Sequence, residues 1–488
     1  MTDEASADRE GVHEGVHEGE HEGVHEGEHE GQDWTGRRVE VTVGPIAHGG
    51  HCVARHCGRV IFVRHALPGE IVEVEVTEDR GGSFCRADAV RVLSPSANRV
   101  EAPCPHARPG GCGGCDFQHV SLSGQRSLKA AVIAEQLQRL AGIDWPVTVL
   151  PLQNTQQDTE QDTEQDTEQE SGLGWRRRIR YAATPDGQLG LRVHRSHQVI
   201  PLQACPLGAP GVGDSEALAE RWPGAAEVEV ATDDAGEVAI LRHTELPIPQ
   251  HLPPRRSAGQ RRGPARRDAR SRRSRTRTVT EQVAGPDRLS YRVAGSQFSV
   301  SAGGFWQTHP RAAEEYTRSV LAAAGLRPGD RVLDLYAGAG LFTVALATAV
   351  TSAGAVIGLE ADRRAVADAE LNLTDRPWAE VRAGAVTEAA VNALADELGQ
   401  IAAVVLDPPR SGAGRDVMAA VLATGASVVV YVACDPAALA RDIHYARQAG
   451  WDLSELCAFD AFSMTHHVEC IATLRPAGAG EPSDDVQA

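Results

Sequence analysis

The chain has 488 residues, 42% of them hydrophobic, which is enough for about two to four globular domains. Its net charge of −19 is concentrated in two tracts: residues 1–33 hold 12 acids against one Arg, and residues 157–170 hold seven acids and no base. Because the remainder is close to neutral, the net charge does not exclude a nucleic-acid partner. The amino terminus has no apolar stretch typical of a signal peptide, and the sequence has no run of about 18 apolar residues that could span a membrane. These features predict a cytoplasmic protein. No feature indicates an obligate protein partner.

Four segments have compositions typical of disorder. We expect an acidic tail over residues 1–33, inserts over 153–171 and 253–280, and a short tail over 477–488. None of these segments can bury enough apolar surface to offset the entropy of ordering it. The second insert is rich in Arg, with 11 Arg against one Asp between Arg255 and Arg277. Such a tract suits contact with RNA phosphates as well as a plain linker, and both readings stay open.

Two structured regions precede the most informative part of the chain. Residues 34–93 alternate apolar and polar side chains over short segments such as 39–43 and 71–76, and Gly and Pro turns separate them. This pattern predicts a small antiparallel β-barrel of the OB-like kind. Residues 94–300 combine a helical stretch at 125–140 with strand patterns near 176–183 and 189–194, which predicts a mixed central domain.

Residues 301–476 alternate strands with helices, which is typical of an α/β, doubly wound sheet. The predicted strands are 331–335, 355–359, 401–406, 427–432 and 469–474.

A glycine turn after the first of these strands predicts a ligand site. Residues 334–340 run from the strand into the turn, and Glu360 stands 20 residues after Gly340, where an acid can bind ribose hydroxyls. A dinucleotide site is the rival reading, but Thr343 occupies the position of its third Gly. The sequence Asp-Pro-Pro-Arg at 407–410 instead suits a site that holds a flat base beside a sulfonium methyl donor.

A cysteine and an acid stand at two further strand ends. Cys434 lies between the apolar run 427–432 and a helical pattern that begins with Pro, so it would be presented to a ligand. Glu469 is followed by apolar residues, which predict a buried strand. Acids are rarely buried, so an acid at the start of such a strand indicates a functional role. Uracil C5 is a weak nucleophile, but a thiolate that adds at C6 creates an enolate that can attack a methyl group from C5. A base must then remove the C5 proton. Cys434 and Glu469 fit these two roles.

Three further cysteines form a second cluster. Cys104, Cys112 and Cys115 lie close together in the sequence, and such thiols in a reducing compartment indicate a soft metal site. A tetrahedral set needs a fourth ligand, for which Cys205 is the candidate. The spacing alone is compatible with iron and sulfur or with zinc.

Together these motifs resemble those of the RNA uracil-5 methyltransferase family, S-adenosylmethionine enzymes that act on tRNA or ribosomal RNA. The resemblance covers most of residues 34–476 and is carried by 305–307, 334–340, 407–410, 431–442 and 466–469. It implies a class I methyltransferase sheet, with Cys434 as the nucleophile and Glu469 as the base. The methyl donor is then expected at Gln307, Tyr336, Glu360 and Asp407. Residues 34–93 look like the RNA-binding barrel called TRAM, with the sequence Leu-Pro-Gly-Glu at 67–70.

The resemblance also bears on the cysteine cluster and the substrate. The ribosomal RNA branch of the family carries a four-iron four-sulfur cluster on a similar set of cysteines, which favours iron and sulfur over zinc and ribosomal RNA over tRNA. The predicted activity is methylation of uridine C5 in structured RNA through a covalent adduct of Cys434. Two alternatives stay open: an amino-group methyltransferase acting on adenine or guanine, which needs no thiol, and a non-catalytic RNA-binding protein on the same fold.

Overall fold

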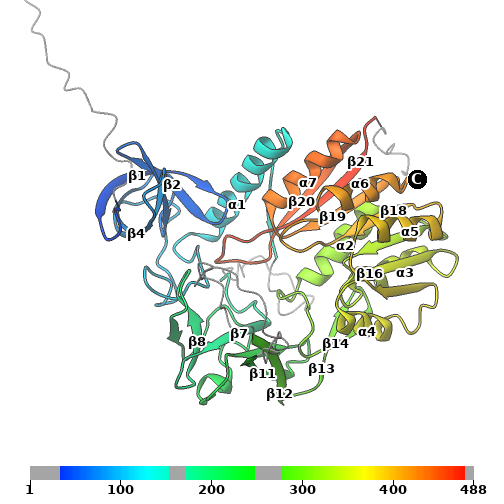
Figure 1. Ribbon diagram of the computed structural model, residues 1–488, viewed down its shortest axis with the longest axis horizontal. Helices are drawn as coiled ribbons and strands as arrows, with labels where there is room; N and C mark the ends of the chain where they lie inside the picture. Colours follow the sequence, from blue (N-terminus) through cyan, green and yellow to red (C-terminus); the bar gives the residue numbers. More distant parts are fainter. Residues whose placement is uncertain (1–32, 153–170, 248–275, 479–488) are drawn as a thin grey trace, which may run out of the picture.

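The computed structural model describes residues 33–152, 171–247 and 276–478. The predicted tails and inserts therefore lie almost entirely outside the described residues. The described chain forms a small barrel, a six-stranded sheet and an eight-stranded sheet covered by helices, which lie around a common centre (Figure 1). No helix in these three ranges is long and apolar enough to cross a bilayer.

The amino-terminal region is a closed five-stranded barrel, as the alternating pattern predicts. The strands follow the order β1-β2-β3-β5-β4 around the barrel. Their bounds are β1 (Arg38–Ala47), β2 (His51–His56), β3 (Arg59–Arg64), β4 (Ile71–Asp79) and β5 (Phe84–Ser94). Every second residue is buried over 39–43 of β1 and 72–76 of β4, because successive side chains of a strand point to opposite faces. The expected all-antiparallel pairing is wrong at one place, since β3 and β5 run parallel.

The central region contains an antiparallel sheet with the strand order β12-β11-β10-β7-β8-β9. Its strands are β7 (Arg178–Ala183), β8 (Leu189–Arg192), β9 (Val199–Pro201), β10 (Glu227–Thr232), β11 (Val238–Pro247) and β12 (Thr276–Ala284). A short 3-10 helix, η2 (Glu216–Leu218), follows β9. The insert predicted at 253–280 extends too far, because residues 276–280 already pair with β11. The high Arg content hid this edge strand, whose polar side chains are exposed.

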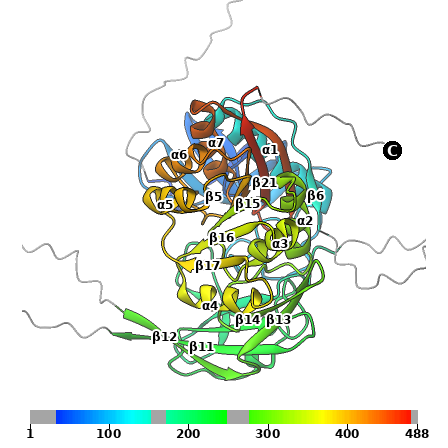
Figure 2. The ribbon, with the colours of Figure 1, turned by 90° about the vertical axis from the view of Figure 1, so that its right-hand side faces the viewer.

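The carboxyl-terminal region is the predicted doubly wound sheet, with the order β17-β16-β15-β18-β19-β21-β20-β6. Its strands are β15 (Arg331–Leu335), β16 (Ala355–Glu360), β17 (Ala379–Ala383), β18 (Ala403–Leu406), β19 (Val428–Ala433), β20 (Trp451–Asp460) and β21 (Glu469–Pro476). The helices α2 (Ala312–Ala324), α3 (Leu341–Val350), α4 (Arg363–Asn372), α5 (Glu388–Leu398), α6 (Arg415–Ala423) and α7 (Pro436–Gln448) cover its two faces (Figures 1 and 2). The first five strands of this order run parallel, and β21 runs antiparallel to β19.

Several elements from the predicted central domain pack on this sheet. Strand β6 (Val149–Pro151) pairs with β20 and extends the sheet by one strand. Helix α1 (Leu122–Gln136) and the π-helical turn η1 (Leu137–Ala141) bury Ile133 and Leu137 in a core shared with α7, and they contact α7 and β6. The hairpin of β13 (Arg288–Val293) and β14 (Ser296–Ser301) packs against α2, α3 and α4. A boundary at residue 300 therefore cuts through a continuous core.

Candidate active site

Three of the four residues predicted to bind the methyl donor stand at the ends of neighbouring parallel strands. Tyr336, Glu360 and Asp407 stand at the carboxyl ends of β15, β16 and β18, and β15 pairs with both other strands. The backbone N–H of Tyr336 donates to Leu359 at 2.9 Å, and that of Asp407 donates to Leu335 at 3.2 Å. The strand order reverses between β15 and β18, which is where doubly wound sheets bind ligands.

Glu360 holds the glycine turn in shape. Its carboxylate accepts hydrogen bonds from the backbone N–H of Gly338 at 3.0 Å and of Asp362 at 2.7 Å. Gly340 has a φ of +86°, and a Cβ there would lie 3.2 Å from Ala369 Cβ. The turn therefore requires glycine at this position.

Two acids near the carboxyl ends of β15 and β18 have raised pKa values. The carboxyl of Asp334 accepts a hydrogen bond from Thr343 Oγ1 at 2.5 Å, and burial raises its pKa to about 7. Burial, followed by the nearby Asp334, likewise raises the pKa of Asp407 to about 7. Thr343, which replaces the third Gly of a dinucleotide motif, is thus the partner of a buried acid.

Gln307 lies apart from these strand ends, in the loop between β14 and α2. It is half-buried and follows Trp306, whose ring stacks on Tyr291 with centroids 4.7 Å apart. This stacking anchors the loop on the β13–β14 hairpin. The position of the loop does not by itself assign Gln307 to the methyl donor, so its role stays a prediction.

The antiparallel insertion of β21 brings Cys434 and Glu469 together. Ala433, at the end of β19, pairs with Cys470 of the antiparallel strand β21. Cys434, which follows Ala433, and Glu469, which precedes Cys470, are therefore neighbours. Glu469 is 5% exposed and begins β21, whereas Cys434 is half-buried. A thiol and a buried carboxyl from sequence positions 35 residues apart therefore share one end of the sheet.

The electrostatics of this pair depend on burial and on Arg410. Burial and then Glu469 raise the pKa of the Cys434 thiol to about 11, and Arg410 opposes the rise. Burial and then Asp407 raise the pKa of Glu469 well above its ordinary value. The hydroxyl of Tyr316 in α2 is also buried near Glu469 and Asp407, without a hydrogen-bond partner among the described atoms. A raised pKa makes the ionised Glu469 carboxylate a stronger base.

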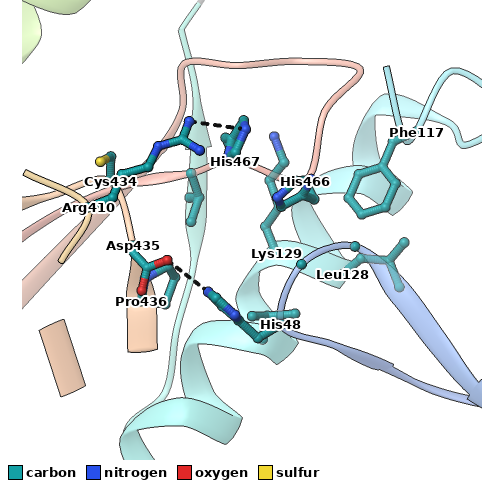
Figure 3. A pocket seen from close by; sticks show the side chains of 14 residues that line it. His48, Phe117, Leu128, Lys129, Arg410, Cys434, Asp435, Pro436, His466 and His467 are labelled. Atoms are coloured by element: carbon teal, nitrogen blue, oxygen red, sulfur yellow. Dashed lines mark hydrogen bonds and ion pairs between the residues drawn. The ribbon is translucent and has the colours of Figure 1, made fainter. Parts of the chain in front are cut away.

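Cys434 opens onto a cavity of about 200 Å³ (Figure 3). Arg410, His466 and His467 line it from the large sheet, and Arg410 lies 3.3 Å from His467 Nε2. Lys129 of α1 also lines it, and its ammonium group pairs with Asp460 at 2.5 Å. The sequence patterns did not single out Lys129, and no local signal marks it, because its partner is 331 positions away.

The four predicted metal-ligating cysteines line a single cavity elsewhere in the molecule. Gly114 N–H donates to Cys112 Sγ at 3.3 Å, and Gln118 Nε2 donates to Cys115 Sγ at 3.1 Å. Such N–H···S bonds are a feature of iron–sulfur sites. No three His, Cys, Asp or Glu side chains in the described ranges are arranged to hold one metal ion. The fit therefore rests on four thiols around one cavity, Cys104, Cys112, Cys115 and Cys205.

Comparison with known families supports this geometry. Residues 34–90 match the TRAM domain, and residues 269–476 match the family described as tRNA (Uracil-5-)-methyltransferase. An RNA methyltransferase of Streptomyces avermitilis is 42% identical over 465 residues, covering 91% of this chain and 100% of the relative. The chain belongs to the RNA uracil-5 methyltransferase family. The predicted enzyme class, an S-adenosylmethionine-dependent RNA (uracil-5-)-methyltransferase, is confirmed.

Two further similarities concern particular members of this family and fold. The 23S rRNA (uracil(1939)-C(5))-methyltransferase RlmD of Acinetobacter baumannii is 31% identical, with 87% of this chain and 91% of the relative covered. The structure of a Pyrococcus abyssi tRNA (uracil-54, C5)-methyltransferase in complex with S-adenosyl-L-homocysteine superimposes with a TM-score of 0.61. It covers 89% of this chain and 100% of that chain at 19% identity, which confirms the fold class alone.

Proposed function

We propose that this family member methylates C5 of a uridine in ribosomal RNA through a covalent adduct of Cys434. The juxtaposition of Cys434 with Glu469, produced by the β19–β21 register, carries this proposal. The ribosomal substrate is supported by the 23S rRNA enzymes among the relatives, which are 29% and 31% identical to this chain. A ribosomal RNA substrate also supports the prediction of a cytoplasmic enzyme.

The proposed reaction assigns one step to each residue. The Cys434 thiol loses its proton and adds to C6 of the uracil, which moves electron density to C5. When bound, S-adenosylmethionine would give the methyl group of its sulfonium to C5 and leave as S-adenosylhomocysteine. Tyr336, Glu360 and Asp407 would hold it at the ends of their strands, with Gln307. Glu469 then removes the C5 proton, and Cys434 leaves from C6 so that the C5–C6 double bond is restored.

The thiolate needs help from its surroundings, because burial raises the pKa of Cys434 to about 11. Arg410 is the cation that lowers this pKa, and it lies beside Cys434 in the cavity (Figure 3). A bound sulfonium would add a second positive charge nearby. We propose that Arg410 stabilises the thiolate of Cys434 before the target uracil enters the cavity.

An RNA carrying 5-fluorouridine at the target tests the covalent mechanism. Fluorine at C5 blocks the final proton removal, so the wild-type enzyme should form an adduct that survives denaturing electrophoresis. Cys434→Ala should form none, while Cys57→Ala, which removes an exposed thiol of the barrel, should react like the wild type. An adduct in Cys434→Ala would exclude this nucleophile, and methylated adenine or guanine without any adduct would favour the amino-group alternative. Comparing 23S rRNA and tRNA transcripts as substrates tests the choice of RNA.

We also propose that Cys104, Cys112, Cys115 and Cys205 hold a four-iron four-sulfur cluster, with zinc as the alternative. The four thiols line one cavity, and backbone and side-chain N–H groups donate to two of the sulfurs. The cavity lies outside the Cys434 pocket, so the cluster would have a structural or RNA-orienting role.

A further inference from the structure

The turn between β1 and β2 of the barrel forms part of the Cys434 cavity. His48, Gly49 and Gly50 line this cavity together with Cys434 and Asp435 (Figure 3). The barrel is thus in contact with Asp435, the residue that follows the proposed nucleophile, although 387 positions separate His48 from Asp435 in the sequence. One wall of the cavity is absent unless the barrel is docked on the large sheet.

His48 makes the direct connection at this wall. Its Nε2 lies 3.0 Å from Asp435 Oδ2, and both side chains are partly buried, with 39% and 25% of their surfaces exposed. The other carboxylate oxygen of Asp435 accepts the N–H of Ala438 at 2.8 Å and so caps α7. Asp435, the residue next to Cys434, therefore holds the start of α7 with one oxygen and the barrel with the other.

Gly50 makes a second contact from the same turn. It has a φ of +79°, and a Cβ there would lie 2.7 Å from His466 Cβ. His466 is itself held by Asp116, whose carboxylate is 2.5 Å from its Nδ1 and 3.3 Å from Arg64 of the barrel. The turn thus contacts both Asp435 and His466, which line the same cavity as Cys434.

We propose that His48 is a positioning residue that docks the barrel on Asp435 and so completes the pocket that receives the target uridine. This inference rests on the proposed role of Cys434. Because the barrel belongs to an RNA-binding domain family, docking through His48 would couple capture of the RNA to presentation of one flipped base at the thiol. His48 itself takes no part in bond making.

His48→Ala and His48→Gln test the inference by single-turnover formation of the 5-fluorouridine adduct at saturating RNA. We expect His48→Ala to lower this rate at least tenfold, because a misplaced wall disturbs the orientation of the base, with S-adenosylmethionine binding changed less than twofold. His56→Ala is the matched control, since it removes a histidine from the far end of β2 outside the cavity. An unchanged rate in His48→Ala, or an equal loss in His56→Ala, would overturn the inference.

The pH dependence separates positioning from general damage to the fold. The hydrogen bond with Asp435 raises the pKa of His48, Glu135 acts in the same direction, and burial and Arg139 oppose it. The ion pair therefore exists below this pKa and weakens above it, whereas Gln can bond to Asp435 but does not titrate. The ratio of the wild-type rate to the His48→Gln rate should therefore fall as pH rises. The other titratable or charged groups of the cavity are present in both enzymes, so their titration cancels in this ratio: Lys129, Arg410, Cys434, His466 and His467. A ratio that is constant with pH would contradict a role for the ion pair.

The two proposals fail differently. An adduct formed by Cys434→Ala would remove the proposed function together with this inference. Loss of the adduct in Cys434→Ala with wild-type behaviour in both His48 variants would remove only the role of His48.

Discussion

At the scale of single residues, the site is governed by the ionisation of a few buried groups. The thiol of Cys434 and the carboxyl of Glu469 both have raised pKa values, because burial disfavours their charged forms and each lies near other acids. The first must lose its proton to act and the second must be able to accept one. Arg410 is the neighbour whose charge favours the thiolate.

Arg410→Ala should shift the reactivity of Cys434 to higher pH. The thiolate fraction rises with pH toward the pKa of about 11, and removing Arg410 raises this pKa further, so the reaction near neutral pH becomes slower. We expect about a tenfold slower alkylation of Cys434 by iodoacetamide at pH 8, which corresponds to about one unit of pKa. Peptide mass spectrometry measures this rate separately from the other cysteines. Arg410→Lys keeps the charge and should stay close to the wild type, and equal rates for all three enzymes would exclude this role.

Glu469→Gln should stop the reaction after methyl transfer. The amide cannot accept the C5 proton, so Cys434 cannot leave, and a methylated protein–RNA adduct should accumulate with unmodified uridine RNA. Mass spectrometry of the denatured complex detects the adduct and its added methyl group. Normal turnover with no adduct would show that another group, such as Asp407, removes the proton.

At the scale of secondary-structure elements, an ion pair on a buried carboxylate joins the barrel to the segment that leaves it. The carboxylate of Glu70, in the turn between β3 and β4, accepts N–H groups of Leu67 at 2.8 Å and Ser96 at 3.0 Å. Arg99 binds both oxygens of the same carboxylate at 2.6 Å. The Leu-Pro-Gly-Glu sequence at 67–70 thus ends in an acid that closes its own turn and anchors the chain after the barrel.

Glu70→Gln should destabilise the barrel by about 3 kcal/mol, because it leaves Arg99 without a charged partner in a buried place. Hydrogen exchange over β1, β4 and β5 measures the local effect, and Glu40→Gln on the exposed face of β1 is the control. Burial opposes ionisation of Glu70, but Arg99 and the two N–H groups outweigh it and lower its pKa. The stabilisation is therefore complete above the ordinary Glu pKa and is lost as pH falls through the lowered one. Protection that is unchanged in Glu70→Gln would contradict this account.

At the scale of the whole molecule, three parts meet at the loop before Glu469. They are the segment that carries Cys104, Cys112 and Cys115, the barrel and the large sheet. The N–H groups of Asp116 and Phe117, next to Cys115, both donate to the Met464 carbonyl at 3.0 Å. Gln125 of α1 donates to Met464 Sδ at 3.3 Å and accepts its N–H at 2.7 Å. The segment leading to the proposed base is therefore held by residues from outside the large sheet.

Cys205→Ser should lower the iron content of anaerobically purified protein as much as Cys112→Ser does, since the two thiols line the same cavity. Iron analysis and the brown charge-transfer absorption of the cluster provide the measurement. Cys457→Ser, in β20, is the control and should retain all of its iron. Stoichiometric zinc without iron would favour the alternative metal, and full iron in Cys205→Ser would exclude it as the fourth ligand.

The sequence by itself determined the local features of this protein. Alternating apolar and polar side chains marked the strands of the barrel, and apolar runs that end near a Gly, a Pro or an acid marked the strand ends that carry Tyr336, Glu360, Asp407 and Cys434. These features are readable because strand period, turn chemistry and strand length depend on residues close together in the chain. The family resemblance rested on the same short segments.

Only the tertiary structure decided which of these features meet. The insertion of β21 between β19 and β20 set Glu469 beside Cys434, and β6 and α1 joined a sheet that begins almost 200 residues later. Residues such as His48 and Lys129 carry no local signal, because their partners lie 387 and 331 positions away. Strand order and domain docking follow from how apolar faces are covered throughout the molecule, and no short window of sequence contains that information.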